Sequence, residues 1–85
     1  MPHATMKHVK TKVHFHNHSK HDCLIQQATT QYPFTVSDVV RKNGGQKDFV
    51  LKDNLADGTY DYEVVHTNDI RSITVPSVDI TEDIN

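Results

Sequence analysis

The side chains of this chain best suited to bind a metal ion lie between residues 14 and 23. The segment HFHNHSKHDC holds four histidines, one aspartate and the only cysteine of the chain. Neutral imidazole binds Zn²⁺, Cu²⁺ and Ni²⁺, and thiolates and carboxylates are further ligands for such ions. The segment therefore indicates a copper or zinc site, whose predicted ligands are His14, His16, His18 and His21.

The spacing of these histidines indicates how they would converge. His14 and His16 are two residues apart, and on a strand such residues project from one face about 6.5 to 7 Å apart. His18 or His21 would then reach the same ion from the following turn. The alternative is that histidine fills these positions only because it is soluble, since the segment lacks a recognised ligand spacing such as C-x-x-C.

Cys23 and His66 are further candidate ligands, and each also has a structural interpretation. Cys23 is the single cysteine, so it cannot form an internal disulfide, and it fits a small buried residue of a strand. His66 follows a strand-like run, where it would pack against Tyr60 and Tyr62. The structural interpretation is favoured for both residues.

No group of residues indicates catalysis. Ser19 lies near two histidines, but no G-x-S-x-G elbow surrounds it. Acidic residues occur singly along the chain, and the loop from Asp53 to Asp57 lacks the ligand spacing of a calcium loop. The sequence therefore gives no support for an enzyme.

Alternation of apolar and polar residues predicts the strands that would carry these side chains. Residues 9–16 alternate with a period of two, which buries Val13 and Phe15 and turns the histidines outward. Further strands are expected over 22–27, 31–36, 47–52, 59–66, 70–75 and 78–80, with Pro33 reducing the second of these to an edge or a bend. Residues 37–42 are expected to form a turn or a short helix, and residues 81–85 to fray.

These short strands predict an all-β fold, an antiparallel sandwich or barrel, of which we expect a small antiparallel β-sandwich. The 85 residues suffice for one domain, with its core between about residues 9 and 80. The side chains expected to be buried are Val13, Phe15, Ile25, Phe49, Leu51, Tyr60, Tyr62 and Val64. Lys12, His14, His16, Asp61 and Glu63 are expected to face solvent, because a one-residue slip would bury them instead.

The charge distribution excludes some classes of partner. Residues 1–21 carry four lysines and no acidic residue, yet the whole chain has a net charge of −2. This positive charge is too small for a nucleic-acid surface, and no aromatic residues interleave with the lysines to stack bases. No apolar run approaches the roughly 18 residues that cross a bilayer, and no secretory signal is recognisable. We therefore expect a cytoplasmic protein, or the mature form of an exported one.

Three motifs follow one another along the chain: VHFHNHS at 13–19, GGQKDFVL at 44–51 and GTYDYEV at 58–64. In this order they resemble the cupredoxin-like β-sandwich. In that family a V-x-F-x-N strand precedes the first copper histidine, an F-x-L strand follows a glycine-containing turn, and G-T-Y-x-[FY] opens the strand leading to the copper loop. The resemblance spans about residues 9–75 and implies a cupredoxin-like sandwich, with an immunoglobulin-like one as the alternative.

The ligand pattern of the cupredoxins does not carry over. Val64 stands near the place of the family's cysteine, no methionine follows it, and a blue-copper centre needs the thiolate. By the same resemblance, His21 lies near the first histidine ligand, and His66 lies about one position away from the second. The resemblance thus implies this scaffold without a type 1 copper site, and it argues against electron transfer.

Two functions from different classes follow. The first is a non-enzymatic binding module that contacts a protein partner, or a second copy of itself, through a surface or an edge strand. The alternative is a metal-handling protein that binds copper or zinc through the four histidines between residues 14 and 21. Neither a nucleic acid nor a membrane is indicated as a partner.

Overall fold

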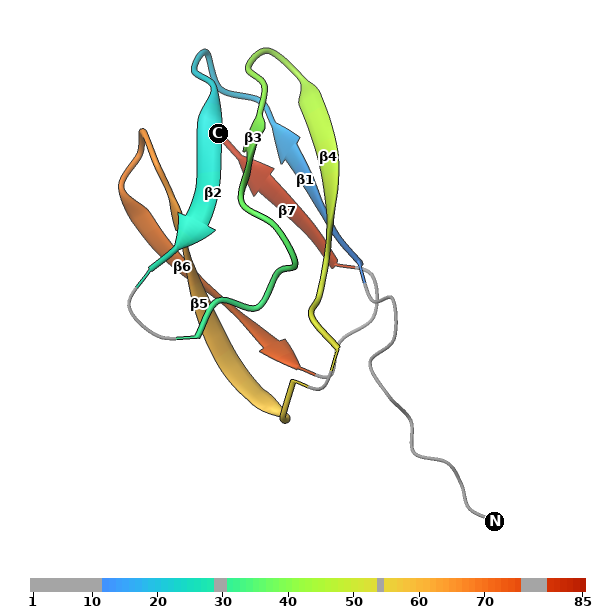
Figure 1. Cartoon of the computed structure of the whole chain (residues 1–85). Coiled ribbons are helices and arrows are strands. Elements are labelled where there is room, and N and C mark those ends of the chain that lie inside the picture. The colour runs from blue at the N-terminus through green and yellow to red at the C-terminus, as the bar shows by residue number, and fades with distance from the viewer. Residues whose placement is uncertain (1–11, 29–30, 54, 76–79) are drawn as a thin grey trace.

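The protein is an all-β sandwich of two packed sheets (Figure 1). The structure, a computed structural model, describes residues 12–28, 31–53, 55–75 and 80–85. The strands are β1 (Lys12–Asn17), β2 (Cys23–Gln27), β3 (Asp38–Val40), β4 (Gly45–Val50), β5 (Gly58–Val64), β6 (Asp69–Val75) and β7 (Ile80–Ile84). No helix occurs in these ranges, and none is therefore long and apolar enough to cross a bilayer. The predicted fold class is confirmed.

The two sheets have the strand orders β4-β1-β7 and β3-β2-β5-β6. Neighbouring strands run antiparallel with one exception, the parallel pair of β1 and β7. Parallel neighbours need a long crossover connection. Here the chain between them passes through the whole second sheet and returns, so that the last strand lies beside the first.

The core contains aromatic rings from both sheets. Phe15 packs edge-on against Phe49, with ring centroids 5.0 Å apart, and against Tyr62 at 5.5 Å. Of the side chains predicted to be buried, all but the partly buried Tyr60 are buried. The other buried residues among those described are Asn17, Cys23, Tyr32, Pro33, Phe34, Val40, Leu55, Ile73, Val75 and Ile84. The alternation of residues along β1 and β5 thus identified the side of each strand that packs inward.

Ion pairs connect the edge strands of one sheet to the edge strands of the other. Lys47 of β4 and Asp38 of β3 approach to 3.0 Å, and Arg71 of β6 and Glu82 of β7 approach to 3.5 Å. Charged side chains of the four edge strands therefore connect the two sheets.

The prediction of a turn or short helix over residues 37–42 is wrong. Residues 38–40 form β3, in which Val40 is buried and pairs with Cys23 of β2. The following turn takes positive φ at Asn43 (59°) and Gly44 (94°), and a Cβ at Gly45 would collide with the carbonyl oxygen of Arg41. The segment forms a strand because Val40 is buried beside Cys23 of β2 and the tight turn at residues 43 and 44 follows it.

Residues 31–36 form no regular strand, in agreement with the bend that Pro33 was expected to impose. A bridge between Phe34 and Leu51 pairs them with the segment after β4, and the Tyr32 hydroxyl donates to the carbonyl oxygen of Ile25 at 3.3 Å.

The segment 81–85 was expected to fray, but its residues 81–84 form most of β7. Ile84 is fully buried, and its carbonyl oxygen accepts a hydrogen bond of 2.7 Å from the His18 amide. The predicted strand positions 9–11 and 78–79 lie outside the described residues.

Candidate functional site

His14 is held by two side chains of the neighbouring strand β4. Its Nδ1 lies 2.6 Å from Oδ1 of Asp48 and its Nε2 lies 2.9 Å from Oε1 of Gln46. The hydrogen bond to Asp48, and then the one to Gln46, raises the pKa of His14, while the hydrogen bond from His14 lowers the pKa of Asp48. Both ring nitrogens face oxygen acceptors, so the protonated imidazolium satisfies both contacts.

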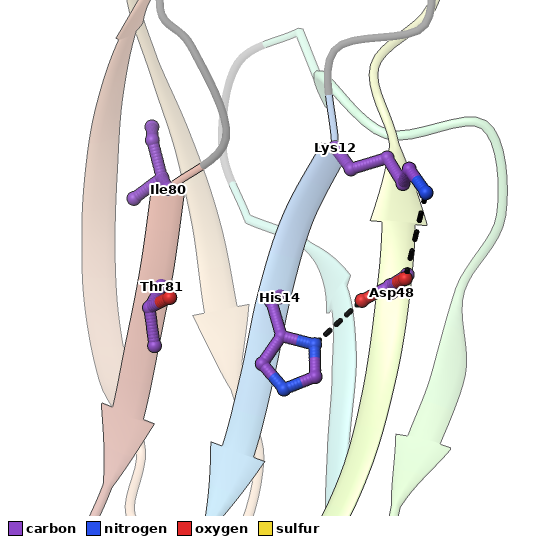
Figure 2. Close-up of a pocket in the computed structure, with 5 residues that line it drawn as sticks. All are labelled: Lys12, His14, Asp48, Ile80 and Thr81. Carbon is purple, nitrogen blue, oxygen red and sulfur yellow. Dashed lines mark hydrogen bonds and ion pairs between the residues drawn. The ribbon is translucent and has the colours of Figure 1, made fainter.

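The surroundings of His14 form a shallow hollow on the outer face of the sheet (Figure 2). Its lining residues are Lys12, His14, Asp48, Ile80 and Thr81. Asp48 lies between the two basic groups, with its second carboxylate oxygen 3.9 Å from the Lys12 ammonium. The hollow therefore holds one carboxylate between two basic groups, and both nitrogens of the imidazole are already engaged.

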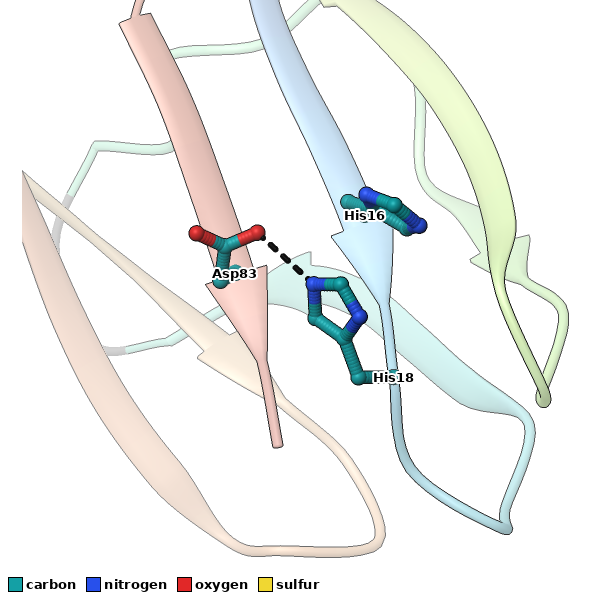
Figure 3. A group of neighbouring side chains, drawn as sticks. All are labelled: His16, His18 and Asp83. Carbon is teal, nitrogen blue, oxygen red and sulfur yellow. Dashed lines mark hydrogen bonds and ion pairs between the residues drawn. The ribbon is translucent and has the colours of Figure 1, made fainter.

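His16, His18 and Asp83 form a separate group farther along the same face (Figure 3). One ligand atom from each residue lies within 4.8 Å of those from the other two. The two imidazole rings are 4.0 Å apart between centroids, at an interplanar angle of 36°, and His18 Nε2 lies 3.0 Å from Asp83 Oδ1. The side chains of His18 and Asp83 are 43% and 54% exposed, so an ion can reach them from solvent.

The pairing of the first and last strands brings this group together. In the parallel ladder His16 lies opposite Asp83, and both point away from the core because Phe15 and Ile84 point into it. His18 follows directly after β1. The sequence reasoning missed Asp83 because its segment was expected to fray, and the three polar residues between Ile80 and Ile84 give no alternating strand signal.

His21 lies elsewhere, against His66. Their ring centroids are 3.7 Å apart at an interplanar angle of 30°. His66 belongs to the turn after β5 and has a φ of 100°. These are the two residues that the cupredoxin resemblance placed nearest to that family's histidine ligands. Among the described residues no third histidine, cysteine or carboxylate joins them in a ligand group.

Asn17 organises the loop between these two pairs of histidines. It is fully buried, and its amide donates to the carbonyl oxygens of His21 (2.8 Å) and Val40 (2.9 Å). Its Oδ1 accepts hydrogen bonds from the backbone amide and the hydroxyl of Ser19 at 2.9 and 2.7 Å. A polar residue at an inward position of the alternation was the sequence signal for this role.

Cys23 is fully buried at the start of β2, as its structural interpretation predicted. Its thiol lies 3.4 Å from the carbonyl oxygen of His21, to which it donates. It does not belong to the group formed by His16, His18 and Asp83. The structure thus brings together two of the four predicted histidine ligands, directs His14 to β4, and directs His21 to His66.

Comparison of the chain with protein-family models, with curated proteins and with solved structures gives no match. The resemblance to the cupredoxins therefore rests on the three sequence motifs alone. Any functional conclusion must come from the chemistry of the site itself.

Proposed function

We propose that this protein binds a copper or zinc ion at the exposed group of His16, His18 and Asp83, and that it is a metal-handling protein. The observation that carries the proposal is the proximity of three ligand atoms within 4.8 Å of one another. Two imidazoles and a carboxylate form a donor set that Zn²⁺ and Cu²⁺ both accept. Water would complete the coordination on the solvent side.

Binding requires only side-chain rearrangement. The lone pair of an imidazole nitrogen lies in the plane of its ring. The planes of His16 and His18 are tilted by only 36°, so their lone pairs do not converge on one point. One ring must therefore rotate before both can bind the same ion. Exposed side chains change rotamer readily. The ion would replace the proton between His18 and Asp83, which are already 3.0 Å apart. The backbone of β1 and β7 can stay in place.

The position of the site favours a function in which the ion is exchanged. A structural zinc site is closed by four protein ligands, whereas this group supplies three and faces solvent. Because affinity for nitrogen and oxygen ligands rises from Zn²⁺ to Cu²⁺, we expect Cu²⁺ to bind more tightly than Zn²⁺.

The test is a titration with Zn²⁺ followed by the imidazole resonances in NMR spectra, and with Cu²⁺ followed by its electron paramagnetic resonance. Both should be made in a His3→Ala/His8→Ala background, so that only the histidines of the described residues remain. We expect saturable one-to-one binding with a Kd at or below about 1 μM. Binding should be lost in a further His16→Ala/His18→Ala variant.

His21→Ala is the matched control, because it removes a histidine of the same loop that lies outside the group. It should leave the affinity unchanged. Weak broadening without a defined stoichiometry, or an equal loss of binding in the control, would contradict the proposal.

A second candidate function is a protein interaction module, as the sequence also indicated. The observation in its favour is the exposure of two valines at β3, which is an edge strand among the described strands. Val39 of β3 is 37% exposed, and Val36, which precedes the strand, is 50% exposed. An extended segment of a protein partner would add a strand at this edge. Sedimentation velocity should then show an associated species with that partner that Val39→Lys abolishes, whereas an unchanged sedimentation profile would argue against this edge.

A further inference from the structure

Apolar packing holds β7 only weakly. Among the described strands it pairs with β1 alone, so it lies at the edge of its sheet. Ile84 is its one fully buried side chain, Ile80 is partly buried, and the three residues between them are polar. A strand with so few buried contacts is of the kind that opens locally. Other interactions must keep Asp83, which β7 carries, beside His18.

Polar contacts from the opposite sheet supply such an interaction. Tyr62 and Arg71 are partners across β5 and β6, and both approach Glu82 of β7. The Tyr62 hydroxyl donates to Glu82 Oε1 at 2.9 Å, and Nη1 of Arg71 lies 3.5 Å from the same oxygen. Burial, and then the Glu82 carboxylate, raises the pKa of Tyr62, so the hydroxyl keeps its proton and remains a donor.

Arg71 also contacts the backbone of the candidate ligand residue. Its Nη1 donates to the carbonyl oxygen of Asp83 at 3.1 Å. On the other side of β7 the His18 amide donates to the next carbonyl, that of Ile84, at 2.7 Å. Two successive carbonyls of β7 are therefore held, that of Asp83 by Arg71 and that of Ile84 by His18, whose side chain is hydrogen-bonded to Asp83.

We infer that Arg71 is a positioning residue for the metal site. Together with Tyr62 and Glu82 it holds β7 in the register that presents the Asp83 carboxylate to His18 and His16. This inference rests on the proposed metal-binding function. Arg71 itself touches no ligand atom, because its contacts are with the Glu82 carboxylate, the Asp83 carbonyl oxygen and the Asp69 carboxylate.

A double-mutant cycle on Zn²⁺ affinity tests the inference. Residues that orient metal ligands typically change affinity by about 10- to 100-fold when they are replaced, and we expect a loss at the lower end of this range for Arg71→Gln. Asp83→Asn should weaken binding at least as much. The double variant should bind no more weakly than Asp83→Asn alone, since Arg71 acts only through Asp83. Losses that simply add would overturn the inference.

Hydrogen exchange in the metal-free protein supplies a readout that does not depend on the ion. Arg71→Gln should speed exchange of the β7 amides that pair with β1 and leave those of β5 unchanged. Tyr62→Phe removes only the hydroxyl donor and should act in the same direction, which keeps the test valid if Arg71→Gln fails to fold. Arg41→Gln is the control, because Arg41 is paired with Asp22 at the exposed β3–β4 end and should affect neither measurement.

The outcomes separate the two proposals. If His16→Ala/His18→Ala and Asp83→Asn leave metal binding unchanged, the proposed function is wrong and the positioning role goes with it. If those variants abolish binding while Arg71→Gln and Tyr62→Phe change neither affinity nor exchange of β7, the metal site stands and the role of Arg71 is wrong.

Discussion

His16 and Asp83 face each other across a parallel ladder that joins the first and the last strand of the protein. Sixty-five residues separate His18 from Asp83 along the chain, yet their side chains are hydrogen-bonded. An ion bound by these residues would therefore crosslink β1 to β7. Metal binding and docking of the C-terminal strand are expected to be thermodynamically linked, because a ligand that binds only the folded arrangement stabilises it.

The hydrogen bond between His14 and Asp48 should be visible in the titration of His14. Because that contact raises the pKa of His14, the imidazole should titrate above its usual value of 6.5, and Asp48→Asn should return it toward that value. The Hε1 resonance of His14, followed by NMR over pH 5 to 9, is the measurement. Titration of His14 at the same pH in both proteins would contradict the contact.

The same pair makes stability depend on pH in a defined direction. A raised histidine pKa stabilises the fold below the unfolded value and loses this effect as pH rises through the folded pKa. The lowered pKa of Asp48 stabilises the fold above the unfolded value of 3.8, and this stabilisation is lost as pH falls through the folded pKa. The difference in melting temperature between the wild type and Asp48→Asn should therefore be larger near pH 5.5 than near pH 8.5. An equal difference at both values would mean that the pair is not an ion pair.

Truncation of the aromatic core should be strongly destabilising. Phe15 and Phe49 are fully buried and pack edge-on, so Phe15→Ala or Phe49→Ala should lower the free energy of unfolding by about 3 to 5 kcal/mol. His14→Thr and His16→Thr, on the opposite face of β1, should cost far less in the absence of metal. Urea denaturation measures all four. Silent phenylalanine changes, or unfolding caused by the histidine changes, would show that the register of β1 is wrong.

Loss of the buried Asn17 should weaken the end of the sandwich that bears the histidine loop. Asn17→Ala leaves the Val40 carbonyl without its side-chain donor in the buried interior, at a cost of about 1 to 3 kcal/mol. Ser19→Ala removes only the hydroxyl contacts of the same network and should cost less. Chemical denaturation gives both values, and the reverse order would show that Ser19, not Asn17, organises the loop.

The two glycines of the β3–β4 turn should differ in their tolerance of alanine. A Cβ at Gly44 meets no atom within 4 Å, and only its φ of 94° is unfavourable, so Gly44→Ala should cost about 1 to 2 kcal/mol. A Cβ at Gly45 would collide with the backbone carbonyl of Arg41, so Gly45→Ala should cost more and displace β3 from β4. Melting temperatures of the two variants decide the order, and equal shifts would mean that the turn relaxes freely.

The sequence alone determined the strands whose residues alternate strictly between apolar and polar. A strand has a period of two whatever its partner, so burying Val13 and Phe15 forces His14 and His16 outward. The same reasoning placed Tyr62 and Val64 in the core. It also identified the segment that contains the two histidines of the candidate metal site.

Only the tertiary structure decided which histidines meet and what completes the group. The partner of a side chain depends on which strand lies beside it, and local spacing carries no information about a strand that pairs from the other end of the chain. Thus His14 is hydrogen-bonded to Asp48 of β4, His21 packs against His66 in the turn after β5, and Asp83 of β7 is hydrogen-bonded to His18. The polar segment of β7 forms a strand because β1 pairs with its backbone, Tyr62 donates a hydrogen bond to Glu82, and Arg71 donates one to the carbonyl oxygen of Asp83.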